Sequence, residues 1–155
     1  MRENGGMFLL NLLDRTLSLL DRLALRRGDA EQQTEHLVTG QRGEQAAFFY
    51  LRRLGYLITA RRWRSSRVRG DLDLVGWEKD TLCFIEVKTR STRAVAPAEA
   101  SVDSQKQKVL SRLAFQYLSQ LQMEKIPVRF DIVSVYFEAG TATQFELFRG
   151  AFDWQ

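Results

Sequence analysis

Four charged side chains lie within the short segment Gly70–Arg90: Asp71, Asp73, Glu86 and Lys88. The pattern, D-x-D followed by E-x-K, is typical of a site in which carboxylates hold a divalent cation beside a lysine. Mg²⁺-assisted phosphodiester hydrolysis uses this set, because the ion activates water and neutralises charge on the phosphate. The lysine then positions that water or stabilises the pentacovalent state. The alternative is a surface hairpin whose charges are only solvated.

Two strands joined by a tight turn are predicted to position these side chains. Alternating polarity over Leu72–Trp77 and the β-branched and aromatic run Leu82–Val87 are typical of strands, whereas Glu78-Lys79-Asp80 is typical of a turn. Because side chains alternate between the two faces of a strand, Glu86 and Lys88 are predicted to share one face. The charged face would line a cleft, and the apolar face would enter the core.

The register of this hairpin decides whether two carboxylates meet. If Glu78–Thr81 forms a four-residue loop, Trp77 lies opposite Leu82, and Asp73 lies opposite Glu86 with Cβ atoms roughly 5 Å apart. A shift by one residue would send the two carboxylates to opposite faces. Because like charges opposed on a sheet are destabilising, this register requires a compensating cation. We therefore expect Mg²⁺ or Mn²⁺ as the cofactor.

Further short motifs accompany the hairpin in a fixed order along the chain. They are Gly40-x-x-Gly43-Glu44, Leu51-x-x-x-Gly55-Tyr56, Gly70-Asp71-Leu72-Asp73-Leu74, Phe84-Ile85-Glu86-Val87-Lys88-Thr89-Arg90, Lys106 and Val128-Arg129-Phe130-Asp131. With this ordered set the chain resembles the YraN-like (UPF0102) family of endonucleases, in the restriction-endonuclease-like PD-(D/E)xK superfamily. The resemblance covers roughly Gly40–Val135. One departure is Asp71, where the family usually has Glu.

The resemblance implies both a fold and a set of roles. The fold is α/β, a restriction-endonuclease-like core with a mixed central β-sheet flanked by helices. The implied metal ligands are Asp73, Glu86 and Glu44, and the implied catalytic residues are Lys88, Glu86 and Asp73. For Glu44 we weigh an electrostatic alternative evenly, because a carboxylate in the first turn of the predicted helix Gln41–Leu54 suits the helix dipole.

Composition excludes several kinds of chemistry. The chain has 155 residues, enough for one domain with a real core, and 45% hydrophobic and 27% charged residues are typical of a soluble globular protein. One histidine and one cysteine cannot build a Cys/His zinc site. The single cysteine, Cys83, also allows no intrachain disulfide, and we therefore expect a cytoplasmic protein. Any catalysis is predicted to use carboxylates, lysine and a hard metal ion.

The distribution of positive charge points to a polyanionic partner. The formal net charge is +4, and arginines crowd the segment just before the hairpin. Arginine makes bidentate contacts with phosphate, so we expect nucleic acid, DNA above all; a solvated basic loop is the alternative. Lys106 is near the N-terminus of a predicted helix, where phosphate is favoured. The predicted nucleic-acid-binding residues are Arg61, Arg62, Arg64, Arg67, Arg69, Arg90 and Lys106.

The remaining periodicity predicts an α/β domain over residues 40–155, preceded by an N-terminal segment over residues 1–39. The polar stretch Arg26–Gly43 is predicted to be a linker. The predicted elements are helix Gln41–Leu54, strand Tyr56–Ala60, the hairpin, a helix from about Pro97 or Ser104 to Met123, strand Pro127–Phe137 and edge strand Gln144–Phe148. The predicted buried stripe of the first helix is Ala46, Ala47, Phe49, Tyr50 and Leu54.

Two residues differ in character from their neighbours. Trp63 lies in a predicted arginine-rich loop, where anchoring to the core is the commoner role and stacking on a base is the alternative. Asp131 lies in an apolar strand and needs a partner, for which Arg129 on the same face is one candidate. We favour a structural salt bridge for Asp131 slightly over a metal role.

An amphipathic helix is predicted over Met7–Arg27. Its charged residues interrupt the apolar pattern too often for a transmembrane span, and no convincing signal-cleavage site follows it. We expect this helix to pack on its own domain. The alternatives are self-association, which would allow a homodimer, a partner groove, and a membrane surface.

Three functional hypotheses follow from the sequence. The first is a metal-dependent nuclease that hydrolyses phosphodiester bonds in DNA, either branched or single-stranded. The second is a non-catalytic nucleic-acid-binding accessory protein on a nuclease-like scaffold, because a fold does not guarantee a function. The third assigns the main role to the N-terminal helix. Salt-sensitive binding without cleavage under any divalent metal would favour the second.

Overall fold

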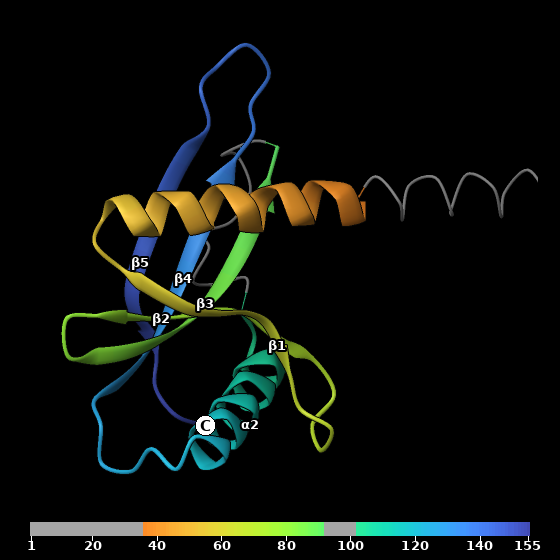
Figure 1. The fold of residues 1–155 in the computed structure, drawn as a ribbon. Helices are drawn as coiled ribbons and strands as arrows, with labels where there is room; N and C mark the ends of the chain where they lie inside the picture. The colour runs from red at the N-terminus through yellow and green to blue at the C-terminus, as the bar shows by residue number, and fades with distance from the viewer. Residues whose placement is uncertain (1–35, 92–101) are drawn as a thin grey trace, which may run out of the picture. The chain divides into compact units, whose positions relative to one another are not determined.

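The structure, a computed structural model, describes residues 36–91 and 102–155. The elements in chain order are a helix over residues 36–53, then β1 (Leu57–Arg64), β2 (Asp71–Glu78), β3 (Thr81–Arg90), α2 (Ser104–Gln120), β4 (Val128–Tyr136) and β5 (Gln144–Phe152) (Figure 1). This order confirms the predicted succession of a helix, three strands, a helix and two strands.

The strands form one five-stranded sheet in the order β1-β2-β3-β4-β5. Neighbouring strands are antiparallel except for β3 and β4, which are parallel. A parallel pair needs a crossover connection, and α2 lies in the one between β3 and β4. The sheet is therefore mixed, and the fold belongs to the α/β class, as expected.

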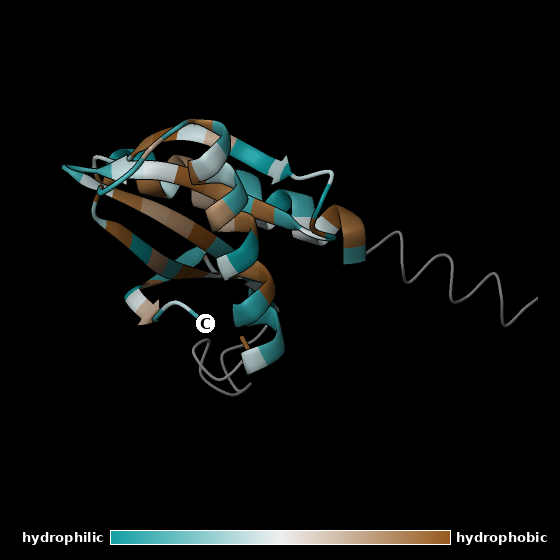
Figure 2. Cartoon of the chain, turned by 90° about the horizontal axis from the view of Figure 1, so that it is seen from below, coloured by the Kyte–Doolittle hydropathy of each residue, from teal (hydrophilic) through white to brown (hydrophobic). Residues whose placement is uncertain are grey.

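Each of the two described helices covers a different face of the sheet. On one face, Leu82 and Phe84 of β3 pack in a cluster with Leu113 of α2. On the other face, Ile85 of β3 packs in a cluster with Leu51 of the 36–53 helix. Hydrophobic stretches accordingly run along the strands in Figure 2. The first half of β3 is thus apolar on both faces, and its charged face begins only at Glu86.

The first helix begins earlier than predicted. Residues 36–43 are helical, so the prediction that they belong to a linker is wrong. Each glycine in a helix costs roughly 1 kcal/mol relative to alanine, but Gly43 serves packing, because a Cβ there would overlap the side chain of Thr89. The predicted buried stripe is also partly wrong, since Phe49 is 49% and Leu54 is 45% exposed.

Strand β1 extends through the arginines that were predicted to form a loop. Arg61 and Arg64 belong to the strand, which lies at the edge of the sheet. Charged side chains are common on edge strands, because they oppose pairing with other chains. The anchoring prediction for Trp63 is confirmed: its ring lies edge-on to that of Tyr117, with centroids 5.2 Å apart, and it packs against the core cluster on the α2 face.

The second helix starts at Ser104, which is one of its two predicted starts. The side chain of Asp103 caps this end, because it accepts a hydrogen bond from the backbone N–H of Lys106 at 2.8 Å. It ends at Gln120 rather than at Met123. Strand β5 extends to Phe152, beyond its predicted end.

Other predictions fall outside the described residues. These are the amphipathic helix Met7–Arg27, residues 26–35 of the predicted linker, and the alternative helix start at Pro97. The division into segments 1–39 and 40–155 therefore stays a prediction. Over residues 36–91 and 102–155, the structure contains no helix of the length and apolar character that crossing a membrane requires.

Candidate active site

The hairpin of β2 and β3 has the predicted register. Trp77 lies opposite Leu82, and the pairing continues regularly to Leu74 and Ile85. Glu78 and Thr81 also pair, so the connection is tighter than the four-residue loop expected.

The regular pairing ends just before Asp73. The Asp73 Oδ2 atom instead accepts a hydrogen bond from the backbone N–H of Val87 at 2.7 Å. This bond ties the Asp73 carboxylate to β3, beside Glu86. The two carboxylates predicted to meet are therefore brought together.

The Glu86 carboxylate is buried, with 5% of the residue exposed. Its Oε1 atom accepts a hydrogen bond from Lys88 Nζ at 2.9 Å and lies 3.2 Å from Lys106 Nζ of α2. Its Oε2 atom is also buried, yet it has no hydrogen-bond partner in the part of the chain that the structure describes. A buried polar atom without a partner is costly, because it has lost its water. Glu86 is therefore only half satisfied.

The neighbouring carboxyl group is strongly perturbed. Burial, followed by the charge of Glu86, raises the pKa of Asp73 to about 7. The hydrogen bond from Val87 and the charge of Lys106 oppose this shift but do not cancel it. Two carboxylates in this position resist simultaneous ionisation, and a bound cation would relieve the repulsion. Such perturbed groups are characteristic of functional sites.

The third implied metal ligand, Glu44, forms an ion pair with Arg62. Glu44 still lies close enough for its charge to raise the pKa of Asp73. The alternative role at the helix dipole is wrong, because the helix continues from Glu44 back to residue 36 and so places the residue in its interior. Arg62 has a positive φ of 49°, a conformation that non-glycine residues rarely adopt.

The residues fit a metal site built on two carboxylates. Across residues 36–91 and 102–155, no group of three or more His, Cys, Asp or Glu side chains is arranged to hold an ion. Mg²⁺ does not need such a group, since it is usually bound by one or two carboxylates together with water and substrate phosphate. Asp73 and the available Oε2 of Glu86 supply that pair.

Asp71, where the sequence departs from the usual family pattern, pairs with a different residue. Its Oδ2 atom lies 3.5 Å from Nη2 of Arg64, whose side chain is 74% exposed. Exposed pairs of this kind contribute little to stability. The structure thus pairs Asp71 with Arg64 at the end of β1 rather than with Glu86.

The predicted nucleic-acid-binding arginines do not form one uniform surface. Arg67 and Arg69 are exposed in the loop after β1. Arg61 lies over the ring of Phe48, with 4.8 Å between guanidinium and centroid. The Nε atom of Arg90 is buried and has no hydrogen-bond partner within the described ranges. Five of the seven predicted residues are exposed, whereas Arg90 and Lys106 are partly buried.

Asp131 has the structural role favoured from the sequence. It is 0% exposed, and both of its oxygens accept hydrogen bonds from Arg129, at 2.7 and 2.9 Å. Tyr56 donates a further bond at 3.2 Å, and the backbone N–H of Gly150 donates one at 3.0 Å. The predicted pairing of Asp131 with Arg129 is confirmed.

The same arginine connects Asp131 to a second acid. Nη2 of Arg129 lies 2.6 Å from Glu78, and Arg149 contacts Glu78 at 2.8 Å from the other side. These contacts, led by the hydrogen bond from Arg149, lower the pKa of Glu78 to about 2. This second charged cluster is therefore stabilised in its ionised form.

Sequence reasoning missed contacts between residues that are far apart in the chain. Lys106 was predicted to meet phosphate, but its ion pair with Glu86 was not foreseen. Nor was the close approach of Gly43 to Thr89, although a glycine within a helical pattern is a usable signal of close packing.

Comparison with known proteins identifies the family of the chain. Residues 43–135 match the family described as "Uncharacterised protein family UPF0102". The chain belongs to this family. It is 48% identical over 126 residues to a UPF0102 protein of Koribacter versatilis, covering 79% of this chain and 87% of the relative. It is 41% identical over 113 residues to one of Solibacter usitatus, covering 73% and 84%. The family membership predicted from the sequence motifs is therefore confirmed.

Proposed function

We propose that this UPF0102 protein is a metal-dependent nuclease that hydrolyses phosphodiester bonds in DNA. The observation that carries the proposal is the state of Glu86. One of its oxygens is held by Lys88 and Lys106, while the other is buried without a partner among the described residues. Asp73 lies beside it with a raised pKa. This is an incomplete charge arrangement that a divalent cation and a phosphate group would complete.

Each residue has a definite task in this proposal. Asp73 and Glu86 would hold Mg²⁺ or Mn²⁺, which when bound supplies positive charge at the phosphate and lowers the pKa of a water ligand. Lys88 and Lys106 keep two positive charges beside the buried carboxylate, where they favour a negatively charged phosphate and the further charge that develops during its hydrolysis. In this proposal Lys88 orients the attacking water.

The test is cleavage of end-labelled DNA, both single-stranded and branched, with Mg²⁺ or Mn²⁺. Asp73→Asn and Lys88→Ala should each lower the rate by about 100-fold or more, because each removes a group that acts on the reacting phosphate. Lys125→Ala is the matched control, since Lys125 is an exposed lysine in the loop between α2 and β4 and lines neither the carboxylate pair nor its lysines. Cleavage that persists unchanged in both site variants would show that these residues are not the catalytic centre.

A second candidate function is nucleic-acid binding without catalysis. The ion pair between Glu44 and Arg62 favours it, because this pair engages one of the three implied metal ligands. A non-catalytic protein would bind DNA with an affinity that falls steeply with salt concentration, and would show no cleavage with any divalent metal. Measuring binding and cleavage on the same DNA separates the two candidates.

For the compartment, we propose a reducing cytoplasm. Cys83 is the single cysteine of the chain, and it is fully buried as a free thiol. Burial raises the pKa of this thiol to about 12, so the reactive thiolate is strongly disfavoured. These properties support a packing role for Cys83 rather than a redox role.

A further inference from the structure

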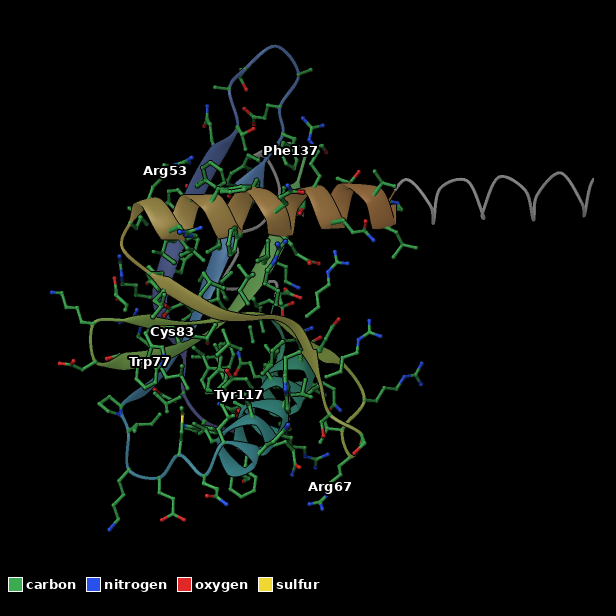
Figure 3. All side chains as sticks on the ribbon, viewed as in Figure 1. Arg53, Arg67, Trp77, Cys83, Tyr117 and Phe137 are labelled. Carbon is green, nitrogen blue, oxygen red and sulfur yellow. The ribbon has the colours of Figure 1, made fainter. Side chains whose placement is uncertain are left out.

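A polar groove lies between the loop that joins β1 to β2 and the C-terminal half of α2. Its volume is about 370 Å³, which is in the range of sites for small ligands. The groove is separate from the carboxylate pair, since neither Asp73 nor Glu86 lines it. Figure 3 labels Arg67 on this loop. The lining residues that matter here are Trp63, Arg64 and Arg67 on one side and Gln116, Ser119 and Gln120 on the other.

The walls of the groove are held by local contacts. Gly70 has a positive φ of 123°, and a Cβ there would lie 3.3 Å from Val109, so the loop returns to the sheet tightly against α2. On the same wall, Trp63 is fixed by its edge-on contact with Tyr117. The backbone N–H of Arg67 donates to the hydroxyl of Ser65 at 3.1 Å, which closes a tight turn. The groove is therefore already formed in the free protein.

The chemistry of the lining suits a nucleotide. Arg64 and Arg67 supply positive charge for phosphate, while Gln116 and Gln120 carry amides that can both donate to and accept from the edge of a base. Trp63, although anchored to the core on one side, also lines the groove, and there it supplies an aromatic surface of the kind on which bases stack in proteins that bind single strands. None of the described lining residues is acidic. A single base can use all these groups only when it is not stacked in a duplex.

Helix α2 connects the groove to the carboxylate pair, because it contributes residues to both. Lys106, near the start of α2, lies at Glu86, whereas Gln116 lies in the groove. With a rise of ~1.5 Å per residue, these two positions are roughly 15 Å apart along the helix axis. Lys108 and Arg112 are exposed on the intervening turns. Positive charge thus continues from one site toward the other.

We propose that this groove binds one nucleotide in a single-stranded flank of the DNA whose phosphodiester bond lies at Asp73 and Glu86. The inference rests on the proposed nuclease function and adds the substrate class: DNA with an unpaired segment next to the cleaved position. Arg67 and Gln116 are binding residues in this proposal, and Trp63 is the platform.

The test is a fluorescence titration of the full chain with single-stranded oligothymidylate, in EDTA and at a fixed salt concentration. The chain has three tryptophans, so Trp77→Phe and Trp154→Phe leave Trp63 as the reporter. Saturable quenching is expected. Arg67→Ala and Gln116→Ala should each raise Kd by about tenfold, the loss expected for one good polar contact. Arg53→Ala, an exposed arginine on the 36–53 helix that lies far from Arg67 in Figure 3, should change Kd less than about twofold.

The outcomes separate this inference from the nuclease proposal, because binding is measured without a metal and cleavage is measured with one. Unchanged Kd values in both groove variants would overturn the groove inference even if Lys88→Ala abolishes cleavage. Equal quenching and equal Kd for a duplex of the same sequence would overturn the single-strand assignment. Groove-dependent binding of the single strand would support the inference even if the wild-type protein cleaves nothing.

Discussion

Two clusters of buried charge in the described part of the chain differ in how completely their carboxylate oxygens are hydrogen-bonded. Around Asp131, both carboxylate oxygens accept two hydrogen bonds each, and the adjacent Glu78 has its pKa lowered to about 2. Around Glu86, one oxygen has two lysines while the other has no partner in the described structure, and the adjacent Asp73 has its pKa raised to about 7. The first cluster is complete, and the second is not.

This difference distinguishes a buried carboxylate that stabilises the fold from one that is suited to bind a ligand. Arginine can satisfy a carboxylate with two parallel hydrogen bonds, as Arg129 does for Asp131. Lysine offers a compact charge, and Lys88 and Lys106 both lie at one oxygen of Glu86. The second oxygen of Glu86 is therefore left available to an ion. A complete cluster stabilises the fold, whereas an incomplete one is suited to bind a ligand.

The largest expected contrast is in stability. Asp131→Ala should lower the free energy of unfolding by about 3–5 kcal/mol, because it leaves buried charged and polar partners unpaired. Glu86→Gln should change it by less than about 1 kcal/mol, since its lysine partners are partly exposed to water. Urea denaturation of both variants measures the difference. Equal losses would mean that both clusters are structural.

The second-largest expected contrast is stabilisation by a metal ion, which should involve only the cluster around Glu86. At a Mn²⁺ concentration of 100 times Kd, the free energy of unfolding should rise by about 2.7 kcal/mol through linkage. Asp73→Asn should abolish this gain, because it removes one of the two carboxylates. Asp71→Asn, a neighbouring substitution at a residue paired with Arg64, should retain it. Thermal unfolding with and without Mn²⁺ measures the effect, and retention of the gain in Asp73→Asn would place the ion elsewhere.

The raised pKa of Asp73 predicts a smaller, pH-dependent effect. Its value of about 7 in the folded protein lies above the ordinary 3.8, so the contribution of Asp73 to stability is full below pH 3.8 and is lost as the pH rises to 7. Asp73→Asn should therefore stabilise the metal-free protein above pH 7, on the order of 1 kcal/mol. The advantage should shrink as the pH falls toward 4. Denaturation curves across this range test the sign, and an advantage that grows toward acid pH would contradict it.

The smallest expected effect concerns Glu44. Arg62→Gln removes an exposed ion pair and should change stability by less than about 1 kcal/mol. It should also tighten Mn²⁺ binding by about two- to fivefold, because the freed Glu44 adds unbalanced negative charge near Asp73. Calorimetric titration of Mn²⁺ into both proteins measures this. Unchanged affinity would remove Glu44 from the metal site.

Local sequence patterns predicted the hairpin well. The turn and the alternation of side chains lie within a few residues of one another, so the pairing of Trp77 with Leu82 could be counted directly. The salt bridge of Asp131 was foreseen for a similar reason, because Arg129 precedes it by two positions on the same strand.

Features that depend on distant contacts were not predictable in the same way. The run of arginines in β1 has a composition typical of a loop, and only its place at the edge of the sheet explains why it forms a strand. The ion pairs of Glu44 with Arg62 and of Lys106 with Glu86 each join different elements. No spacing rule connects such residues, and only the packing of the two helices on the sheet brings them together.

The absence of a side chain at Gly43 has a mechanical consequence for the site. Because a Cβ at this position would overlap the side chain of Thr89, the helix lies closer to β3 here than any residue with a side chain would allow without rearrangement. Glu44 is the next residue of that helix, and Thr89 follows Lys88 on the strand. A single added methyl group would thus force Thr89, or the helix that carries Glu44, to move, even though residue 43 carries no reactive atom of its own.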